Sequence, residues 1–583
     1  MTTTKMKRWV PAVALGVGLA ASVHGCDGGG SRGGSTAAGA SAAAPTSSQT
    51  ATPAGPQAPA ARPRSATVVA RHGEGFLEVH HGGRKVVHTK GTSYERGVQY
   101  GVLVGDEVEG VFNKLTQYVA AQGVGLAASL QTLLTPIGAA VMRPYFDADA
   151  LAELRGIVDG MRLRNPGTFV TEADLIFINS IIDLGAVVNL DVFRCSGLAV
   201  WGSIAKDGKL FQTRCVDLMI GSGIEDHALV VIAKPEGGVP YLNPGWAGMI
   251  GAASGLNARG VGVSQVWAFS IDKGFGRPWI LATRELLATG SSVDDAVRIF
   301  SSHRRTYGSN FVFADRGDTR GGQPRGISIE SSQRDLRIFE SNDPAEDLAL
   351  WNGQPYAIKI PEAVFRGDAY LDPTMRARQT GSAGPTGDPR PTGAYRNRYQ
   401  GQADGIMRFV NAGVKIGADE CIQITKDVAM RRNSLQCVVY ANTDLEVWVA
   451  NSRIGPNGQL FDAWDEPYLH YSLDDYAPVA RAVPDRTTFA RGETVQVAVP
   501  ITTLGRGHGL DVHVALDLGG VTTVLGSATA LTLPDRGAVT AIVDVTIPAG
   551  LGNVGLGALH VEVMETGTTA IVDVARTPVT VTP

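Results

Sequence analysis

The stretch RCSGLAVWGSIAKDGKLFQTRCVD, residues 194–217, predicts the centre of the fold. A cysteine opens an apolar, strand-like run, an Asp-Gly turn follows at Asp207, and a second run returns to Asp217. The hairpin is expected to bring Arg214 and Asp217 back to Cys195. A guanidinium near a thiol favours the thiolate and lowers the pKa of the cysteine, which is what a nucleophile needs.

The sequence around this hairpin mixes helical and strand-like patterns. Upstream, residues 95–120 and 151–161 repeat apolar residues at helical spacing, and Thr171 begins a capped helix. Downstream, strands are predicted at residues 228–233, 261–269, 310–314, 326–330 and 445–451, with helices at 279–287 and 293–301. From residue 477 onward, evenly spaced strands predict an immunoglobulin-like β-sandwich.

Four further motifs accompany the hairpin in the same order as in a known family. They are Gly-x-x-x-Glu-x-Gly-x-x-x-Gly at 91–101, Glu-Leu-x-Gly-Ile-x-x-Gly at 153–160, Gly-Leu-Asn-x-x-Gly at 255–260, and SNFVFAD at 309–315 with Glu330 closing the next strand. Together they resemble the acyl-coenzyme A:6-aminopenicillanic acid acyltransferase-like family of N-terminal nucleophile (Ntn) hydrolases. That group also contains choloylglycine hydrolases and acid ceramidase.

The resemblance implies an α+β protein whose catalytic part is a four-layer αββα sandwich with a helical propeptide. Together with the sequence patterns at the two ends of the chain, the resemblance predicts five segments. They are a signal peptide at 1–25, a linker at 26–66, the propeptide at 67–194, the catalytic part at 195–476 and the C-terminal all-β, immunoglobulin-like sandwich at 477–583.

The resemblance also implies self-processing between Arg194 and Cys195, which leaves Cys195 as a new N-terminus. Its α-amine, with a reference pKa of about 7.7–8.0, can then accept and return the thiol proton. The thiolate attacks the amide of a small-molecule N-acyl substrate, and water or an amine takes the acyl group from the thioester. The α and β fragments remain associated, and no cofactor is needed.

Two more site residues are carried over from the family. A later asparagine supplies the oxyanion donor, for which Asn352 is the candidate and Asn310 the alternative. A downstream arginine completes the set, with Arg396 preferred over Arg398. The catalytic residues expected are thus Cys195, Arg214, Asp217, Asn352 and Arg396. In contrast, Asn257 is interpreted as a turn residue before a strand.

The N-terminus carries the pattern of an exported protein. Three basic residues precede the apolar run Trp9–Val23, which is too short to span a bilayer comfortably and is typical of a signal peptide. The run ends in VHGC, which resembles a bacterial lipobox with Cys26 as the lipid-modified residue. We expect a lipid-anchored protein of the bacterial cell envelope that contacts the membrane only through this anchor. The alternative is a plain signal peptide and a secreted or periplasmic protein.

Composition excludes several other classes. The 52 basic and 56 acidic residues leave a net charge of -4, so a phosphate-tracking nucleic-acid binder is not expected. Five cysteines in 583 residues cannot form a disulfide framework. Cys421 and Cys437 are candidates for a pair in an oxidising compartment, and Cys215 is interpreted as a packing residue. The spacing of the histidines predicts no catalytic metal.

One rival function belongs to another class: a surface binding or scaffold lipoprotein that keeps the fold without the chemistry. Arg194 favours it, because relatives more often have a small residue before the nucleophile.

Overall fold

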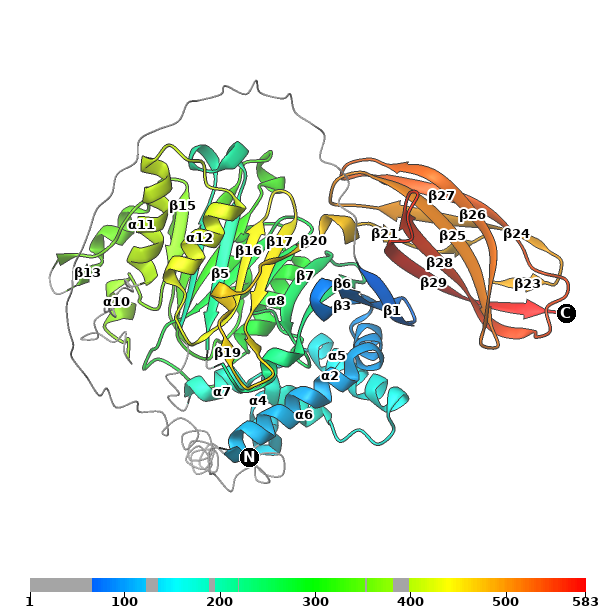
Figure 1. Ribbon diagram of the computed structural model, residues 1–583, viewed down its shortest axis with the longest axis horizontal. Coiled ribbons are helices and arrows are strands. Elements are labelled where there is room, and N and C mark those ends of the chain that lie inside the picture. Colours follow the sequence, from blue (N-terminus) through cyan, green and yellow to red (C-terminus); the bar gives the residue numbers. More distant parts are fainter. Residues whose placement is uncertain (1–65, 122–134, 188–193, 219, 352–353, 381–397) are drawn as a thin grey trace, which may run out of the picture.

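The computed structural model describes residues 66–121, 135–187, 194–218, 220–351, 354–380 and 398–583. It is a mixed α and β structure, as the sequence predicts, with an all-β unit at its C-terminal end (Figure 1). The signal peptide, the linker, Cys26, Asn352 and Arg396 lie outside the described residues. No helix among the described residues is long and apolar enough to cross a bilayer.

The larger sheet has ten strands within the described ranges, in the order β1-β2-β3-β6-β7-β8-β9-β10-β11-β12. These are β1 (Thr67–His72), β2 (Gly75–His80), β3 (Arg84–Gly91), β6 (Ala228–Pro235), β7 (Tyr241–Trp246), β8 (Ser254–Asn257), β9 (Gly262–Trp267), β10 (Ser309–Asp315), β11 (Arg325–Ser331) and β12 (Leu336–Glu340). Strands β3 and β6 pair in parallel, whereas the other neighbours are antiparallel.

The second sheet has six antiparallel strands in the described part of the chain, in the order β15-β4-β5-β16-β17-β20. These are β4 (Arg194–Val200), β5 (Phe211–Asp217), β15 (Ala363–Arg366), β16 (Ser434–Ala441), β17 (Glu446–Asn451) and β20 (Leu469–Ser472). Short pairs join β13 (Leu350–Trp351) to β14 (Gln354–Pro355) and β18 (Arg453–Ile454) to β19 (Leu460–Phe461). Strand β4 ends at Val200, and a 3-10 turn begins at Gly202, whose φ is 62°.

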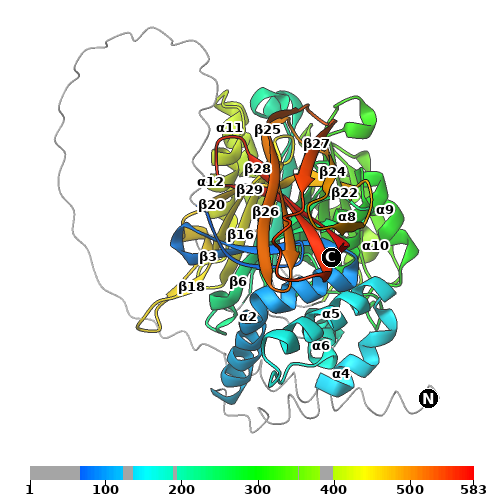
Figure 2. The ribbon, with the colours of Figure 1, turned by 90° about the vertical axis from the view of Figure 1, so that its right-hand side faces the viewer.

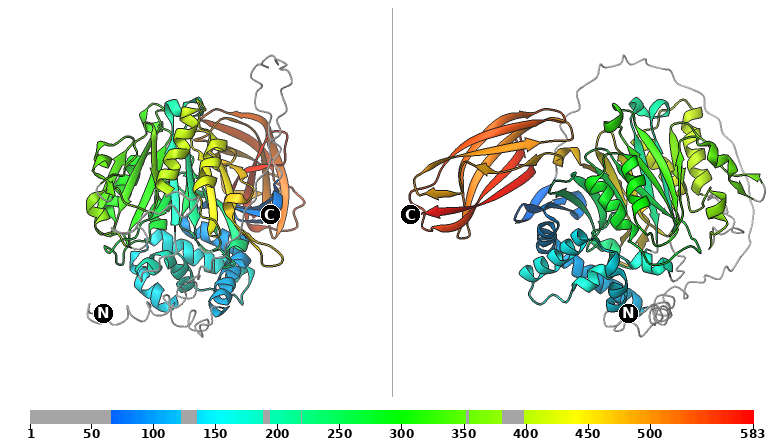
Figure 3. Two further views of the ribbon diagram at one scale, coloured as in Figure 1. Left: turned by 60° about the vertical axis from the view of Figure 1, so that its left-hand side comes forward. Right: turned by 180° about the vertical axis from the view of Figure 1, so that it is seen from behind.

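The helices of residues 93–187 gather at one end of the two sheets, and later helices flank the sheets (Figures 1 and 3). They are α2 (Ser93–Ala121), α4 (Thr135–Met142), α5 (Ala148–Arg164), α6 (Glu172–Ile178), α7 (Ile181–Val187), α8 (Trp279–Thr289), α9 (Val293–Ser302), α10 (Pro373–Arg376), α11 (Arg398–Asn411) and α12 (Ala418–Val428). Helices α2, α5, α8 and α9 share a core with the ten-stranded sheet, and α11 and α12 share one with the six-stranded sheet.

The inner faces of the two sheets pack against each other. One cluster of buried side chains joins Val230 and Leu256 of the larger sheet to Val438 and Val447 of the smaller. Because the other face of the smaller sheet is covered by helices, every residue of its strand β16 is buried.

Helices α2 and α5 approach closely enough to require glycine. The contact is made by Gly97, Gly101, Gly156 and Gly160. A Cβ on Gly101 would lie 2.1 Å from the carbonyl oxygen of Ile157, and one on Gly160 would lie 2.2 Å from that of Val98. The two glycine motifs therefore read as one reciprocal helix contact, in which each helix presents glycine to the backbone of the other.

The segment upstream of Cys195 is part of the main sheet as well as a set of helices. Strands β1 to β3 form one edge of the ten-stranded sheet, and β3 pairs in parallel with β6, from Lys85 opposite Leu229 to Gly91 opposite Pro235. The expected helical propeptide thus contributes strands too. Sequence reasoning missed this pairing because the partner strand lies far along the chain.

The C-terminal unit consists of two sheets over one core. The first contains β21 (Val479–Ala480), β22 (Val483–Pro484), β24 (Thr494–Thr502) and β27 (Ala538–Thr546), and the second contains β23 (Thr488–Ala490), β25 (His508–Leu518), β26 (Val521–Leu533), β28 (Gly555–Glu565) and β29 (Ile571–Thr582). Buried residues alternate with exposed ones along β24 and β27. That period is expected of strands with one solvated face.

This unit lies against the edge formed by β1 to β3 (Figure 2). Asp573 of β29 makes a buried ionic contact between the C-terminal unit and the larger sheet. The Asp573 carboxylate accepts hydrogen bonds from Lys90 Nζ at 2.8 Å and from Lys234 Nζ at 2.7 Å. Burial raises the pKa of Asp573, but Lys234 and Lys90 outweigh burial and lower it overall. Burial lowers the pKa of Lys234 to about 8. Three parts of the chain therefore meet in one desolvated charge cluster.

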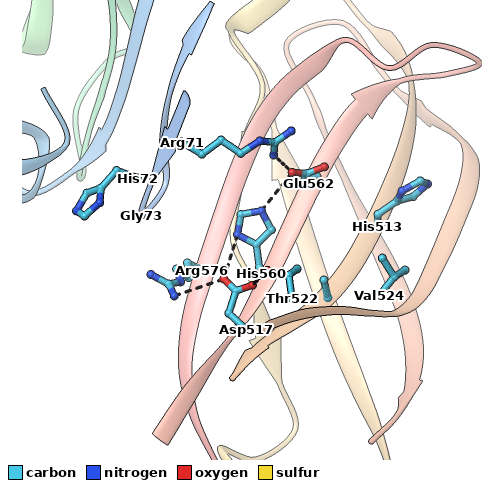
Figure 4. Close-up of a pocket in the computed structure, with 11 residues that line it drawn as sticks. Arg71, His72, Gly73, His513, Asp517, Thr522, Val524, His560, Glu562 and Arg576 are labelled. Atoms are coloured by element: carbon cyan, nitrogen blue, oxygen red, sulfur yellow. Dashed lines mark hydrogen bonds and ion pairs between the residues drawn. The ribbon is translucent and has the colours of Figure 1, made fainter. Parts of the chain in front are cut away.

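A cleft of about 500 Å³ that several charged side chains line lies beside this contact, between the β1–β2 turn and the outer face of the C-terminal unit (Figure 4). Within it, His560 lies between Glu562 and Asp517, at 3.3 Å and 3.9 Å. Arg71 pairs with Glu562, and Arg576 lies 3.4 Å from Asp517. Arg71 belongs to β1 and Glu562 to β28, so their ion pair adds to the same contact, whereas Arg576 and Asp517 pair within the C-terminal unit.

We expect Asp573→Asn to destabilise the whole chain, because it removes the carboxylate that Lys90 and Lys234 share and leaves Lys90 with Glu74, 3.6 Å away. Removing one partner of a buried ion pair costs about 3–5 kcal/mol. Denaturant unfolding should show that loss, whereas Asp544→Asn, on an exposed position of the same unit, should change the free energy of unfolding by about 0.5 kcal/mol or less. Equal stability of the two variants would contradict this role for Asp573.

Candidate active site

The predicted hairpin is confirmed. Strands β4 and β5 pair antiparallel, with Cys195 opposite Val216 and Gly197 opposite Arg214. Directly paired residues project from the same face of a sheet, and side chains two residues apart along a strand do so as well. Arg214 lies two residues before Val216, so it shares with Cys195 the face that meets the larger sheet. Asp217, one residue out of phase, belongs to the other face.

Cys195 is 2% exposed and packs among Val216, Trp246, Val266 and Leu435. Burial raises the pKa of its thiol. The nearby charge of Arg214 and a backbone hydrogen bond with Trp267 lower the thiol pKa, but the pKa stays above its ordinary value. The expected lowering of the thiol pKa is therefore wrong for the uncut chain, because desolvation outweighs the guanidinium.

Arg214 is buried and held by the larger sheet. Its Nε donates to the backbone oxygen of Gln265 at 2.9 Å, and its Nη1 donates to Ser254 Oγ at 3.1 Å. These bonds fix the guanidinium on the inner face beside Cys195. A positive charge fixed there can stabilise a thiolate or an oxyanion.

Asp217 pairs with Arg398, the alternative arginine of the sequence analysis. Arg398 Nε donates to Asp217 Oδ2 at 3.0 Å, and the backbone N–H of Met430 donates to Asp217 Oδ1 at 3.1 Å. Burial raises the pKa of Asp217, and Arg398 opposes that shift. Arg398 stands at the first position of α11, while Arg396, the preferred candidate, lies outside the described residues.

Asp368 is a site residue that sequence reasoning missed. Its Oδ1 accepts from the backbone nitrogen of Cys195 at 3.1 Å, and its Oδ2 accepts from Arg398 Nη1 at 3.0 Å. Arg398 thus bridges two carboxylates, which outweigh its burial and raise its pKa. The side chain of Arg194 lies 3.7 Å from Asp368 Oδ2 and over the ring of Phe269. Only the pairing of β15 with β4 brings Asp368 here, and its local sequence gives no signal of it.

Two motif residues hold the segment that carries Asp368. The amide nitrogen of Asn310 donates to the backbone oxygens of Gly367 and Ala369, at 2.9 and 3.0 Å. Glu330, opposite Asn310 in the β10–β11 register, pairs with Arg366 Nε at 3.1 Å. It also accepts backbone N–H groups just beyond Asp368. In this geometry the side-chain amide nitrogen of Asn310, the alternative oxyanion donor, donates to the backbone oxygens of this segment.

Two asparagines from the sequence analysis remain. Asn352 lies between β13 and β14, outside the described residues. Asn257 is a turn residue, as predicted, because its Oδ1 accepts from the N–H groups of Arg259 and Val261 at 3.0 Å. Among the residues that the structure describes, no three His, Cys, Asp or Glu side chains gather as a metal site.

The predicted cysteine partners are not together. Cys437 lies against Cys215, with 3.1 Å between the sulfur atoms, whereas Cys421 packs in a separate cluster beneath α12. The pairing of β16 with β5 places Cys437 directly opposite Cys215. The interpretation of Cys215 as a mere packing residue is therefore incomplete.

Comparison with known proteins agrees with the motifs. A sequence profile of the family described as acyl-coenzyme A:6-aminopenicillanic acid acyl-transferase matches residues 205–348. This match confirms the family resemblance and supports the general class of amidohydrolases and acyltransferases.

Two relatives align over part of the chain. An uncharacterized protein of Archaeoglobus fulgidus is 22% identical over 268 residues, or 42% of this chain and 44% of that protein. Protein dcd1A of Dictyostelium discoideum is 24% identical over 313 residues, or 50% of this chain and 67% of that protein. The chain thus spans less than half the length of the first of these relatives.

Among solved structures, a Caenorhabditis elegans ortholog of N-acylethanolamine-hydrolyzing acid amidase aligns with 42% of this chain and 93% of its own. Its identity is 14% and the TM-score is 0.30. The CARDB domain of the PF1109 protein from Pyrococcus furiosus, solved in complex with di-metal ions, aligns with 18% of this chain and 89% of its own. Its identity is 17% and the TM-score is 0.15.

We expect Arg398→Leu to destabilise the chain by about 3–5 kcal/mol at pH 7, because Asp217 and Asp368 lose their shared cation. Burial already raises the pKa of Asp217, so as the pH falls this carboxylate takes up a proton at a higher pH in the folded state than in the unfolded state. The deficit should therefore shrink as the pH falls from 7 toward 5. Unfolding titrations at several pH values measure both effects.

Arg408→Leu is the matched control, because Arg408 lies on the same helix and forms an exposed pair with Asp427. That substitution should cost about 0.5 kcal/mol or less at every pH. If Arg398→Leu behaved in the same way, the bridge between the two carboxylates would carry no stability.

Proposed function

We propose that this chain is a self-processing N-terminal cysteine amidohydrolase or acyltransferase that cleaves the linear amide bond of an N-acyl small molecule through a thioester on Cys195. One observation carries the proposal. The nitrogen that donates to Asp368 is the nitrogen of the Arg194–Cys195 peptide bond, which is the bond that self-processing would break. A carboxylate fixed by Arg398 therefore holds the leaving nitrogen.

The cleavage step uses groups already in place. Cys195 Sγ attacks the carbonyl carbon of Arg194, the carbon–nitrogen bond breaks, and the thiol proton passes to the departing nitrogen. Arg214 lies on the face where negative charge develops. Water then hydrolyses the Arg194 thioester, which restores the thiol and leaves a free α-amino group beside Asp368.

Turnover repeats the chemistry on an external amide. The α-amine of Cys195 accepts the thiol proton, and the thiolate forms a thioester with the acyl group of the substrate. The amine part of the substrate then leaves with that proton. Water or an acceptor amine then releases the acyl group. A fixed donor to the oxyanion is worth about 2.7–4 kcal/mol, and we assign that role to Asn352 on the family resemblance.

The surroundings of Cys195 favour an apolar acyl group. Trp246, Val266 and Leu435 pack directly against the cysteine, with Leu218 and Met249 around them. A long or aromatic acyl chain would bury its surface among these side chains at about 25 cal/mol per Å². We therefore favour fatty, phenylacetyl or bile-type acyl groups over polar ones.

The two packed sheets with helices outside them are the arrangement that the four-layer αββα sandwich of Ntn hydrolases would require, and we propose that architecture. We likewise propose that the C-terminal unit is immunoglobulin-like. After cleavage, the α and β fragments would remain associated, because β3 lies within the sheet beside β6 and Lys90 reaches Asp573.

Arg194 supports the rival, a scaffold that keeps the fold without the chemistry, because its side chain fills space between Asp368 and Phe269. The polar contact between Asp368 and the peptide nitrogen of Cys195 favours the enzyme. At the other end of the chain, we propose Cys26 as the lipid-modified residue and the bacterial cell envelope as the location, on the sequence pattern alone.

Purified protein should run as two fragments on a denaturing gel, with Cys195 at the N-terminus of the larger one. Cys195→Ala should run as one chain, because the attacking sulfur is gone. Cys421→Ala, which removes another buried thiol, should still process. Intact mass and N-terminal sequencing measure the result. A wild-type chain that stays whole would favour the scaffold.

Asp368→Asn should slow self-cleavage by about 10²-fold or more, because the variant loses the charge that stabilises the nitrogen as it gains a proton. The rate of fragment appearance after refolding measures this without any knowledge of the substrate. Asp372→Asn is the control, since that carboxylate caps α10 and faces Arg337. Processing of Asp368→Asn at the wild-type rate would remove Asp368 from the mechanism.

A further inference from the structure

Cys215 and Cys437 form a second thiol site, separate from the nucleophile. They lie on neighbouring antiparallel strands in direct register, and both side chains are fully buried. Their sulfur atoms are 3.1 Å apart, so an approach of about 1 Å brings them to the 2.03–2.05 Å of a disulfide. Side chains paired in this way have Cβ atoms close to the separation that a disulfide needs.

Apolar side chains surround the two sulfurs. The cluster is built from the small residues Ala429, Ala450 and Ala463, with Trp464 and Tyr468 packed against it. Ser434 Oγ lies 3.5 Å from the sulfur of Cys215 and 3.4 Å from that of Cys437. The pair belongs to the outer face of the sheet, whereas Cys195 belongs to the inner face, so oxidation of the pair leaves the nucleophile untouched.

The pair also contacts the candidate active site. Cys215 Sγ donates to Asp217 Oδ1 at 3.3 Å, and Asp217 is the carboxylate that pairs with Arg398. A bond between Cys215 and Cys437 would fix β5 against β16 two residues before Asp217.

We infer that Cys215 and Cys437 are a site of oxidative modification, at which a cross-strand disulfide joins β5 to β16 when the chain folds in an oxidising compartment. A dithiol–disulfide carrier or glutathione disulfide is the oxidant. One cysteine attacks the oxidant to give a mixed disulfide, and the second displaces the reduced thiol. Two thiol protons and two electrons leave the pair, and the oxidant becomes two thiols.

Burial determines when this happens. Because both sulfurs are sealed in the folded chain, the bond must form during folding, and the folded dithiol should react slowly with disulfides. Both cysteines lie downstream of residue 195, so the inference holds whether or not the chain cleaves itself.

The full chain, refolded in a glutathione redox buffer or in dithiothreitol, provides the test. Alkylation under denaturing conditions should reveal two fewer thiols in the oxidised sample than in the reduced one. Peptide mapping should recover Cys215 linked to Cys437. The thermal midpoint of the oxidised sample should be about 5–10 °C higher, because the bond closes a long loop.

Variants separate this pair from the other cysteines. Cys421→Ser should still lose two thiols on oxidation, whereas Cys437→Ala should lose none and show no shift of its midpoint. Two results on the wild-type chain overturn the inference: all thiols remain alkylatable after oxidative refolding, or the recovered link joins Cys437 to Cys421. Neither result depends on whether a variant folds.

Discussion

The antiparallel pairing of β4 with β5, inside a sheet covered on both faces, is the constraint on which the site depends. It fixes the phase of both strands, so that Cys195 and Arg214 face the larger sheet and Asp217 faces the helical layer. A slip of one residue would reverse every side chain and place charged groups in an apolar core. Packing on both faces therefore specifies the register and, with it, the chemistry.

The charges around the nucleophile form a chain of contacts rather than a set of independent residues. Arg398 bridges Asp217 and Asp368, and Asp368 in turn holds the backbone nitrogen of Cys195. Buried carboxylates are costly unless they are paired and hydrogen-bonded. Asn310 and Glu330 hold the segment on either side of Asp368, which explains why two residues of a strand motif bear on a site that they do not enter.

The three parts of the chain are joined by backbone pairing and by one buried charge cluster. The β3–β6 pairing places the upstream segment inside the main sheet, and Asp573 brings the C-terminal unit against Lys90 and Lys234. Such contacts would persist after a cut at Cys195, because none of them uses that peptide bond. The C-terminal unit is therefore a structural partner of the upstream segment as well as an appended domain.

The sequence by itself determined the hairpin, several of the helices and strands around it, the all-β character of the C-terminal unit and the family resemblance. These follow from local periodicity, turn residues and short motifs, which act over a few residues. Only the tertiary structure decided that Asp368 meets Cys195, that Arg398 bridges Asp217 and Asp368, and that Cys437 faces Cys215. Each of those contacts is set by which strands become neighbours, and strand order depends on the packing of the whole core rather than on local sequence.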